Sequence, residues 1–170
     1  MNKLLHMTNL ERHYETPAGV VKALDGVSFE IHEGERVILL GPSGSGKTTL
    51  LNCLSALDSP TGGSYTFLSE EVPRYHSEKM TSFRRDNIGY VFQFFNLLQD
   101  LSVLENILLI QELAGKKDPG RAKELLKMVG LEGEINRFPG EISGGQQQRV
   151  AIARSIAKRP RLLLGDELTG

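Results

Sequence analysis

A short glycine-rich stretch between an apolar run and a helical pattern constrains the fold of this chain more than any other feature. The apolar run covers residues 36–40, and the stretch that follows, residues 41–49, reads GPSGSGKTT. From Lys47 onward, leucines recur at helical spacing. A buried parallel strand, a glycine-rich loop and a helix in direct succession predict an α/β fold in which the loop leads into the helix.

The glycine-rich stretch matches the full pattern of a phosphate-binding loop. Gly41 and Gly46 are separated by four residues and are followed by Lys47 and Thr48. Backbone N–H groups of such a loop surround a β-phosphate, and the helix N-terminus adds positive potential. Lys47 would bridge the β- and γ-phosphates, and the Thr48 hydroxyl would bind Mg²⁺. The predicted contacts, which together form the phosphate loop, are Gly41, Pro42, Ser43, Gly44, Ser45, Gly46, Lys47, Thr48 and Thr49.

Two adjacent acids follow a second apolar run. Residues 161–165 read RLLLG and precede Asp166 and Glu167, which predicts a buried strand with acids at its carboxyl end. Because neighbouring carboxylates repel each other, a nearby cation is a natural reason to place both there. Asp166 would then approach Mg²⁺ through a water molecule, and Glu167 would face the attacking water. Acids also end many strands that have no function, so this interpretation depends on the phosphate loop.

A Ser-Gly-Gly-Gln segment, residues 143–146, has the pattern of a helix start. Ser143 and Gln146 have the spacing of a capping box, and the helix would continue through Val150. Gly144 and Gly145 each cost roughly 1 kcal/mol relative to alanine in a helix, and they bring no packing. They are explained if a large anion approaches the bare N–H groups of the helix end. A plain helix cap is the simpler alternative.

The remaining patterns divide one domain into an α/β core and a helical insert. Residues 3–10 and 27–31 are predicted short strands joined by a loop that contains Pro17 and Gly19, and residues 88–92 form the next predicted strand. Helix starts are predicted at Ser102 with Glu105 and at Asp118 with Pro119, and Gly130 is a predicted helix stop. The expected core comprises residues 1–92 and 151–170, and the helical subdomain comprises residues 93–150.

Composition excludes several classes of protein. The chain is 39% apolar and 24% charged with a net charge of −1, so it is a folded domain without the charge for electrostatic nucleic-acid binding. Its single cysteine, Cys53, lies among leucines and is expected to be a buried thiol. The apolar runs are shorter than the roughly 20 residues that span a bilayer, so any membrane role requires a partner. The histidines, which lack metal-like spacing, are His6, His13, His32 and His76.

Taken together, these motifs resemble the nucleotide-binding subunit of ABC transporters over essentially the whole chain. The resemblance rests on the phosphate loop, Gln93 after the strand at 88–92, residues 142–149 (ISGGQQQR) and residues 162–167 (LLLGDE). Within the family, residues 23–29, 84–93 and 96–106 resemble the branch of lipoprotein-release and macrolide-export ATPases, to which a cell-division ATPase is closely related.

The resemblance implies a fold and a set of residue roles. The fold is a P-loop NTPase core with a parallel sheet, an N-terminal antiparallel β part and an inserted α-helical subdomain. Gln93 would contact Mg²⁺ and water, and Tyr14 would stack on adenine. Residues 143–146 would contact the γ-phosphate that the other protomer of a head-to-tail dimer holds. The expected catalytic residues are Glu167, Lys47 and Gln93.

The resemblance also implies cofactors and partners. ATP and Mg²⁺ would join a homodimer or pseudo-dimer, and hydrolysis would release it. The dimer would lie at the cytoplasmic face of the cell membrane against a membrane-spanning permease subunit. The region around residues 93–101 would contact that permease, although Phe92, Phe94 and Phe95 are equally explained by packing.

The sequence departs from the family pattern near Gly170. Family members continue with an Asp-containing dimer contact and a later histidine that senses γ-phosphate, and Gly165 and Leu168 replace the usual alanine and proline beside the two acids. We therefore expect a C-terminally truncated chain that binds ATP, hydrolyses little of it and self-associates through an uncovered sheet. Three alternatives stay open: a cell-division-type regulator that moves no solute, an inactive nucleotide-binding scaffold, and a P-loop kinase.

Overall fold

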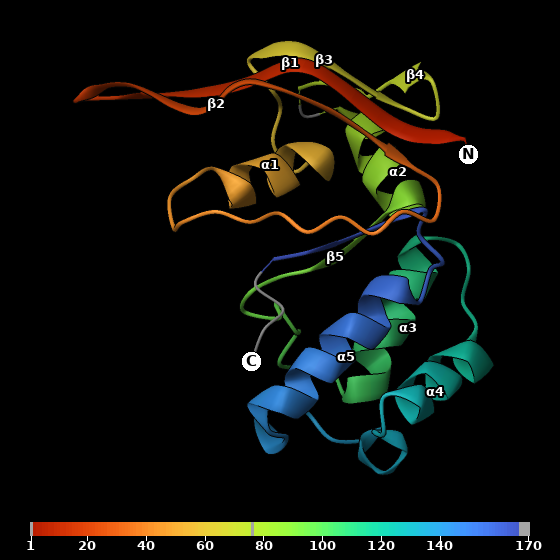
Figure 1. Cartoon of the computed structure of the whole chain (residues 1–170). Coiled ribbons are helices and arrows are strands. Elements are labelled where there is room, and N and C mark those ends of the chain that lie inside the picture. The colour runs from red at the N-terminus through yellow and green to blue at the C-terminus, as the bar shows by residue number, and fades with distance from the viewer. Residues whose placement is uncertain (1, 76, 167–170) are drawn as a thin grey trace. The chain divides into compact units, whose positions relative to one another are not determined.

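The chain divides into two compact units, with the boundary between Arg84 and Arg85. Figure 1 labels the helices and strands of the chain. The structure is a computed structural model that describes residues 2–75 and 77–166. The units are Met1–Arg84 and Arg85–Gly170, and each contains a sheet and helices of its own. The predicted division into a core and an insert at residues 93–150 stays a prediction.

The first unit contains a four-stranded antiparallel sheet with the order β2-β1-β3-β4. Its strands are β1 (Lys3–Thr16), β2 (Gly19–His32), β3 (Gly62–Phe67) and β4 (Glu70–Glu71). The strands predicted at residues 3–10 and 27–31 are present, but their predicted length was wrong, because β1 and β2 each span 14 residues. Register shifts along β1 interrupt the alternation of apolar and polar residues, so the sequence hides the full length of both strands.

The loop predicted around Pro17 and Gly19 is a tight turn at the tip of this long hairpin. Thr16 pairs with Gly19, and its hydroxyl donates a hydrogen bond to the Gly19 carbonyl oxygen at 2.7 Å. The turn predicted at residues 33–35 is present, and it is closed by a hydrogen bond from Glu35 N to His32 O. The hairpin therefore carries the polar end of β1 away from the buried part of the sheet.

Residues 36–40 are not the buried strand that their composition predicts. They pair with no strand among the described residues, and the side chains of Ile38 and Leu40 are 81% and 89% exposed. A parallel strand is stable only between neighbouring strands and under covering layers, whereas the sheet of the first unit is antiparallel throughout. An apolar run specifies a preference for burial but not a partner.

Two helices accompany the antiparallel sheet, α1 (Lys47–Leu54) and α2 (Glu78–Asn87). Helix α1 begins where the leucine spacing predicts, and the Tyr65 hydroxyl of β3 donates to the Leu54 carbonyl oxygen at 2.9 Å. Helix α2 was not predicted, because its sequence offers only two apolar residues, Met80 and Phe83, and of these only Met80 is fully buried. Phe83 of α2 meets Phe67 of β3 edge to face, with ring centroids 5.2 Å apart.

The second unit contains a two-stranded parallel sheet formed by β5 (Ile88–Val91) and β6 (Leu162–Gly165). Both strands were predicted. Strand β5 lies directly against a helix, because a Cβ at Gly89 would overlap the Ser155 carbonyl oxygen and the Pro160 ring. Only glycine permits this approach without displacing backbone.

The described part of the second unit also contains three α-helices and two short 3₁₀ helices. They are α3 (Val103–Leu113), α4 (Pro119–Met128), η1 (Glu132–Glu134), η2 (Pro139–Glu141) and α5 (Gly144–Ile156). The predicted caps are confirmed: Ser102 and Glu105 form a capping box, and the Asp118 carboxylate accepts from Arg121 N. The helices share a buried core that includes Val91, Val103, Ile107, Leu125, Leu126 and Val150. Among the described residues, none of the helices has the length and apolar character needed to cross a bilayer.

Candidate nucleotide site

The phosphate loop turns into helix α1 at Gly46. This residue has a φ of 91°, and a Cβ would overlap the Ala23 carbonyl oxygen of β2. Glycine is therefore required by both the backbone conformation and the close approach. Since glycine has no side chain to cap the helix, the first N–H groups of α1 lack a side-chain cap at this position.

The Lys47 ammonium group folds back over the phosphate loop. It donates hydrogen bonds to the carbonyl oxygens of Gly41 at 2.7 Å and Pro42 at 2.8 Å, and to the Ser45 hydroxyl at 3.4 Å. An ammonium group and uncapped helix N–H groups thus lie on the same loop. This combination suits a phosphate anion, which accepts from both.

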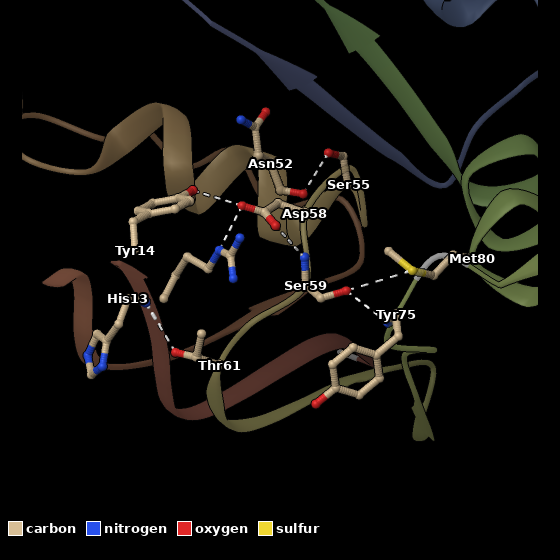
Figure 2. Close-up of polar contacts among 10 residues, drawn as sticks. His13, Tyr14, Asn52, Ser55, Asp58, Ser59, Thr61, Tyr75 and Met80 are labelled. Carbon is tan, nitrogen blue, oxygen red and sulfur yellow. Dashed lines mark hydrogen bonds and ion pairs between the residues drawn. The ribbon is translucent and has the colours of Figure 1, made fainter. Parts of the chain in front are cut away.

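Tyr14 lies near the end of β1, opposite Val21 of β2. Its hydroxyl donates to Asp58 Oδ2 at 2.8 Å (Figure 2). The Arg12 guanidinium lies 4.4 Å from the centre of its ring. Burial and the hydrogen bond to Asp58 raise the pKa of Tyr14. The ring is therefore held in place as a neutral phenol.

Gln93 and Asp166 both follow carboxyl ends of the parallel strands in the second unit. Strand β5 ends at Val91, and the Asp166 N–H donates to the Val91 carbonyl oxygen at 3.1 Å. The pKa of Tyr90 in β5 is raised to about 12, mainly by burial and to a smaller extent by the negative charge of Asp166. The carboxyl ends of parallel strands are where ligands bind in open α/β sheets. Glu167, the predicted partner of Asp166, lies outside the described residues.

The Ser-Gly-Gly-Gln segment forms the predicted capping box at the start of α5. The Ser143 hydroxyl accepts from Gln146 N at 3.2 Å, and Gln146 Oε1 accepts from Ser143 N at 2.8 Å. Gly144 and Gly145 are exposed. Outside the helix itself, no heavy atom of the described residues lies within 4 Å of where a Cβ would sit on either glycine. Packing therefore does not require glycine at these positions.

The connector, residues 93–101, is held by two side chains that no sequence motif predicts. Arg154 of α5 donates to the carbonyl oxygens of Phe95 and Asn96. The buried Asn106 of α3 accepts from Leu98 N at 2.9 Å and donates to three carbonyl oxygens of residues 98–102. No local sequence pattern predicts these hydrogen bonds, because most of them join the connector to a residue of a helix outside it.

The three phenylalanines near the connector differ in their surroundings. Phe92 stacks on Tyr90 with ring centroids 4.3 Å apart, and Phe95 packs against the helical core. Phe94 is 81% exposed. Packing therefore explains Phe92 and Phe95 but not Phe94.

Comparison with known proteins identifies the family. The model of the family described as ABC transporter matches residues 24–170. The chain therefore belongs to the ABC transporter ATP-binding family, and the predicted class, an ABC-type ATPase with a P-loop NTPase fold, is confirmed.

Two relatives illustrate where the chain falls within the family. It is 47% identical to an uncharacterized ABC transporter ATP-binding protein of Thermotoga maritima, over 100% of this chain and 74% of that protein. It is 44% identical to the lipoprotein-releasing system ATP-binding protein LolD of Geobacter metallireducens, over 100% of this chain and 77% of LolD. The lipoprotein-release part of the predicted branch is thus represented, and the macrolide-export part stays a prediction.

Solved structures of similar proteins agree with this family assignment. A dimeric structure of MJ0796, a bacterial ABC transporter cassette, has a TM-score of 0.91 and 41% identity, covering 98% of this chain and 75% of that one. A dimeric structure of a post-hydrolysis state of the ATP-binding cassette MJ0796, bound to ADP and Pi, has a TM-score of 0.91 and 40% identity.

Proposed function

We propose that the protein binds Mg-ATP and drives a membrane-spanning permease by ATP-dependent dimerisation and hydrolysis. The observation that carries this proposal is the presence of two exposed helix starts suited to phosphate. One is the phosphate loop with Lys47, and the other is the Ser143 capping box with its two unpacked glycines. One γ-phosphate does not need both from a single chain, whereas two chains facing each other would use one of each. Both MJ0796 structures are dimeric.

The side chains fit the chemistry that Mg-ATP requires. Mg²⁺ prefers oxygen ligands, and Thr48, Gln93 and Asp166 supply a hydroxyl, an amide and a carboxylate oxygen. When bound, the metal neutralises charge on the phosphate oxygens. Lys47 would exchange its loop carbonyl partners for the β- and γ-phosphate oxygens, and Glu167 would hold the attacking water and accept its proton.

The partner is proposed from the relatives and from one exposed surface. LolD is named as part of a lipoprotein-releasing system, so an exporter or extruder of that kind is the proposed assembly. Phe94 and Leu98 of the connector are 81% and 47% exposed, and apolar side chains on an ordered loop suit contact with a permease. The protein would then lie at the cytoplasmic face of the membrane.

Sedimentation with and without Mg-ATP tests this proposal. A Glu167→Gln variant, which retains nucleotide but does not activate water, should sediment as a dimer in Mg-ATP and as a smaller species without it. Lys47→Ala should abolish both the nucleotide binding and the ATP-dependent dimer. If Glu167→Gln changes neither dimerisation nor phosphate release, the protein is a nucleotide-binding scaffold and the proposal is wrong.

A further inference from the structure

An ion pair outside the predicted motifs joins the nucleotide-side end of β1 to the residues that follow α1. Asp58 Oδ2 accepts from the Tyr14 hydroxyl and from Arg12 Nε, each at 2.8 Å, and Asp58 Oδ1 accepts from Ser59 N at 2.8 Å (Figure 2). The partners are 44 and 46 positions apart in the sequence. Both carboxylate oxygens of Asp58 are therefore occupied.

The ion pair is partly shielded from water. The side chains of Arg12 and Asp58 are 23% and 24% exposed. Burial alone would lower the pKa of Arg12, but the hydrogen bonds with Tyr14 and Asp58 raise it. The cluster thus brings a cation, a carboxylate and a neutral phenol together through charge-assisted hydrogen bonds.

The same residues are tied to the helix that carries the phosphate loop. Asp58 N donates to the Asn52 carbonyl oxygen in α1 at 3.1 Å. Helix α1 begins at Lys47. Asp58 therefore connects the Tyr14 ring to the element that starts at the phosphate loop.

The Tyr14 ring also has one face already covered. The Arg12 guanidinium lies over it at 4.4 Å from the centroid, which is a cation–π distance. A planar base can therefore stack only on the opposite face. The hydrogen bond to Asp58 holds the hydroxyl and with it the direction of the long axis of the ring, and the Arg12 guanidinium over one face opposes rotation about that axis. Together the two contacts set the plane in which a base would be received.

We propose that Asp58 is a positioning residue for nucleotide binding: it sets the orientation of the Tyr14 ring and its distance from the phosphate loop. The inference rests on the proposed contact of Tyr14 with adenine. The contribution of Asp58 to binding is that of one hydrogen bond that restricts one side chain. Loss of this hydrogen bond should therefore weaken nucleotide binding about 3- to 10-fold.

Calorimetric titration of the protein with Mg-ATP and with Mg-tripolyphosphate tests the inference, because the second ligand has phosphates but no base. Tyr14→Phe removes only the hydroxyl, and Asp58→Asn leaves one carbonyl oxygen where two oxygens are used. Both should weaken Mg-ATP binding by the stated factor and leave Mg-tripolyphosphate binding unchanged. The double variant should be no weaker than the weaker single variant, because both changes break the same bond. Asp25→Asn, which alters an exposed ion pair of β2, is the matched control and should behave as the unmodified protein.

Each other outcome has a defined meaning. If Tyr14→Ala weakens Mg-ATP binding but Tyr14→Phe and Asp58→Asn do not, the role of Asp58 is wrong and the adenine contact stands. If Tyr14→Ala has no effect, the adenine contact fails and this inference fails with it. Parallel loss of Mg-tripolyphosphate binding would show that Asp58 only supports the fold. Tyr14→Phe decides the matter if Asp58→Asn does not fold.

Discussion

The Arg154 guanidinium in α5 donates a hydrogen bond to the main-chain oxygen of Phe95, 59 positions earlier, at 2.6 Å. A second bond reaches the Asn96 carbonyl oxygen at 2.7 Å. Phe95 and Asn96 have φ values of 61° and 49°, which L-residues rarely adopt. Burial lowers the pKa of Arg154. A desolvated cation thus supports a strained turn just after Gln93.

Replacing Arg154 should destabilise the protein. Arg154→Ala removes two charge-assisted hydrogen bonds and leaves two carbonyl oxygens of a strained turn without them, so we expect a loss of about 2–4 kcal/mol in the free energy of unfolding. Urea unfolding measures it. Arg149→Ala, which removes one bond from an exposed side chain to the Val129 carbonyl oxygen, should cost less than about 1 kcal/mol. Equal losses for the two variants would contradict a stabilising role for the Arg154 hydrogen bonds to Phe95 and Asn96.

Adding one methyl group at Gly89 should force β5 away from α5. A Cβ there would overlap the Ser155 backbone oxygen, and overpacking of this kind costs about 1–3 kcal/mol. Gly133→Ala places its Cβ more than 4 Å from any described residue outside its own short helix and its chain neighbours, and should be close to neutral. Thermal melts of the two variants compare them directly, and an unchanged melting temperature for Gly89→Ala would be the contrary result.

Gly145→Ala should separate stability from function. The variant meets no atom among the described residues outside its helix, and alanine favours the helix, so stability should stay equal or rise by up to about 1 kcal/mol. The added methyl group would obstruct phosphate, so ATP-dependent dimerisation should weaken about tenfold or more. Gly140→Ala in η2, equally uncrowded, should leave dimerisation unchanged. Retention of dimerisation by Gly145→Ala would favour the plain helix cap.

Alkaline pH should lower the free energy of unfolding, in part through ionisation of Cys53. Burial raises the pKa of this thiol from 9.0 to about 12, the charge of Asp58 adds to the effect, and Arg12 opposes it. Because the folded state binds the proton more tightly, this contribution is fully present below about pH 9 and is lost as the pH rises toward 12. Urea titrations over this range should show a falling free energy of unfolding, with a shallower fall for Cys53→Ala. Part of the slope should remain, since burial also raises the pKa of Tyr65 and Tyr90. An identical slope in the variant would contradict the assignment.

Local rules explain which elements the sequence could predict. The caps at Ser102, Asp118 and Ser143 were correct because a cap is decided by residues within one turn. Strands β5 and β6 were correct because both are short, apolar and bounded by glycine or polar residues. Residues 36–40 satisfied the same rule and failed, since a strand also needs a neighbour that its own residues do not specify.

The candidate site was predictable where it follows a motif and not where it depends on long-range contacts. The phosphate loop and residues 143–146 could be proposed from the sequence because the spacing of their residues defines each motif. Arg12 and Asp58 could not, because the ion pair joins positions 46 apart and neither residue belongs to a pattern. Asn106 was likewise missed, although its buried amide makes four hydrogen bonds.

The absence of a side chain at Gly89 has a mechanical consequence. The backbone of β5 at Gly89 lies directly against the backbone of α5 at Ser155. No flexible side chain of Gly89 separates the two. Helix α5 follows its N-cap Ser143, and strand β5 leads toward Gln93. Arg154 of the same helix is hydrogen-bonded to the turn that follows Gln93. We therefore expect the start of α5 and the segment around Gln93 to keep the same relative position when either of them moves.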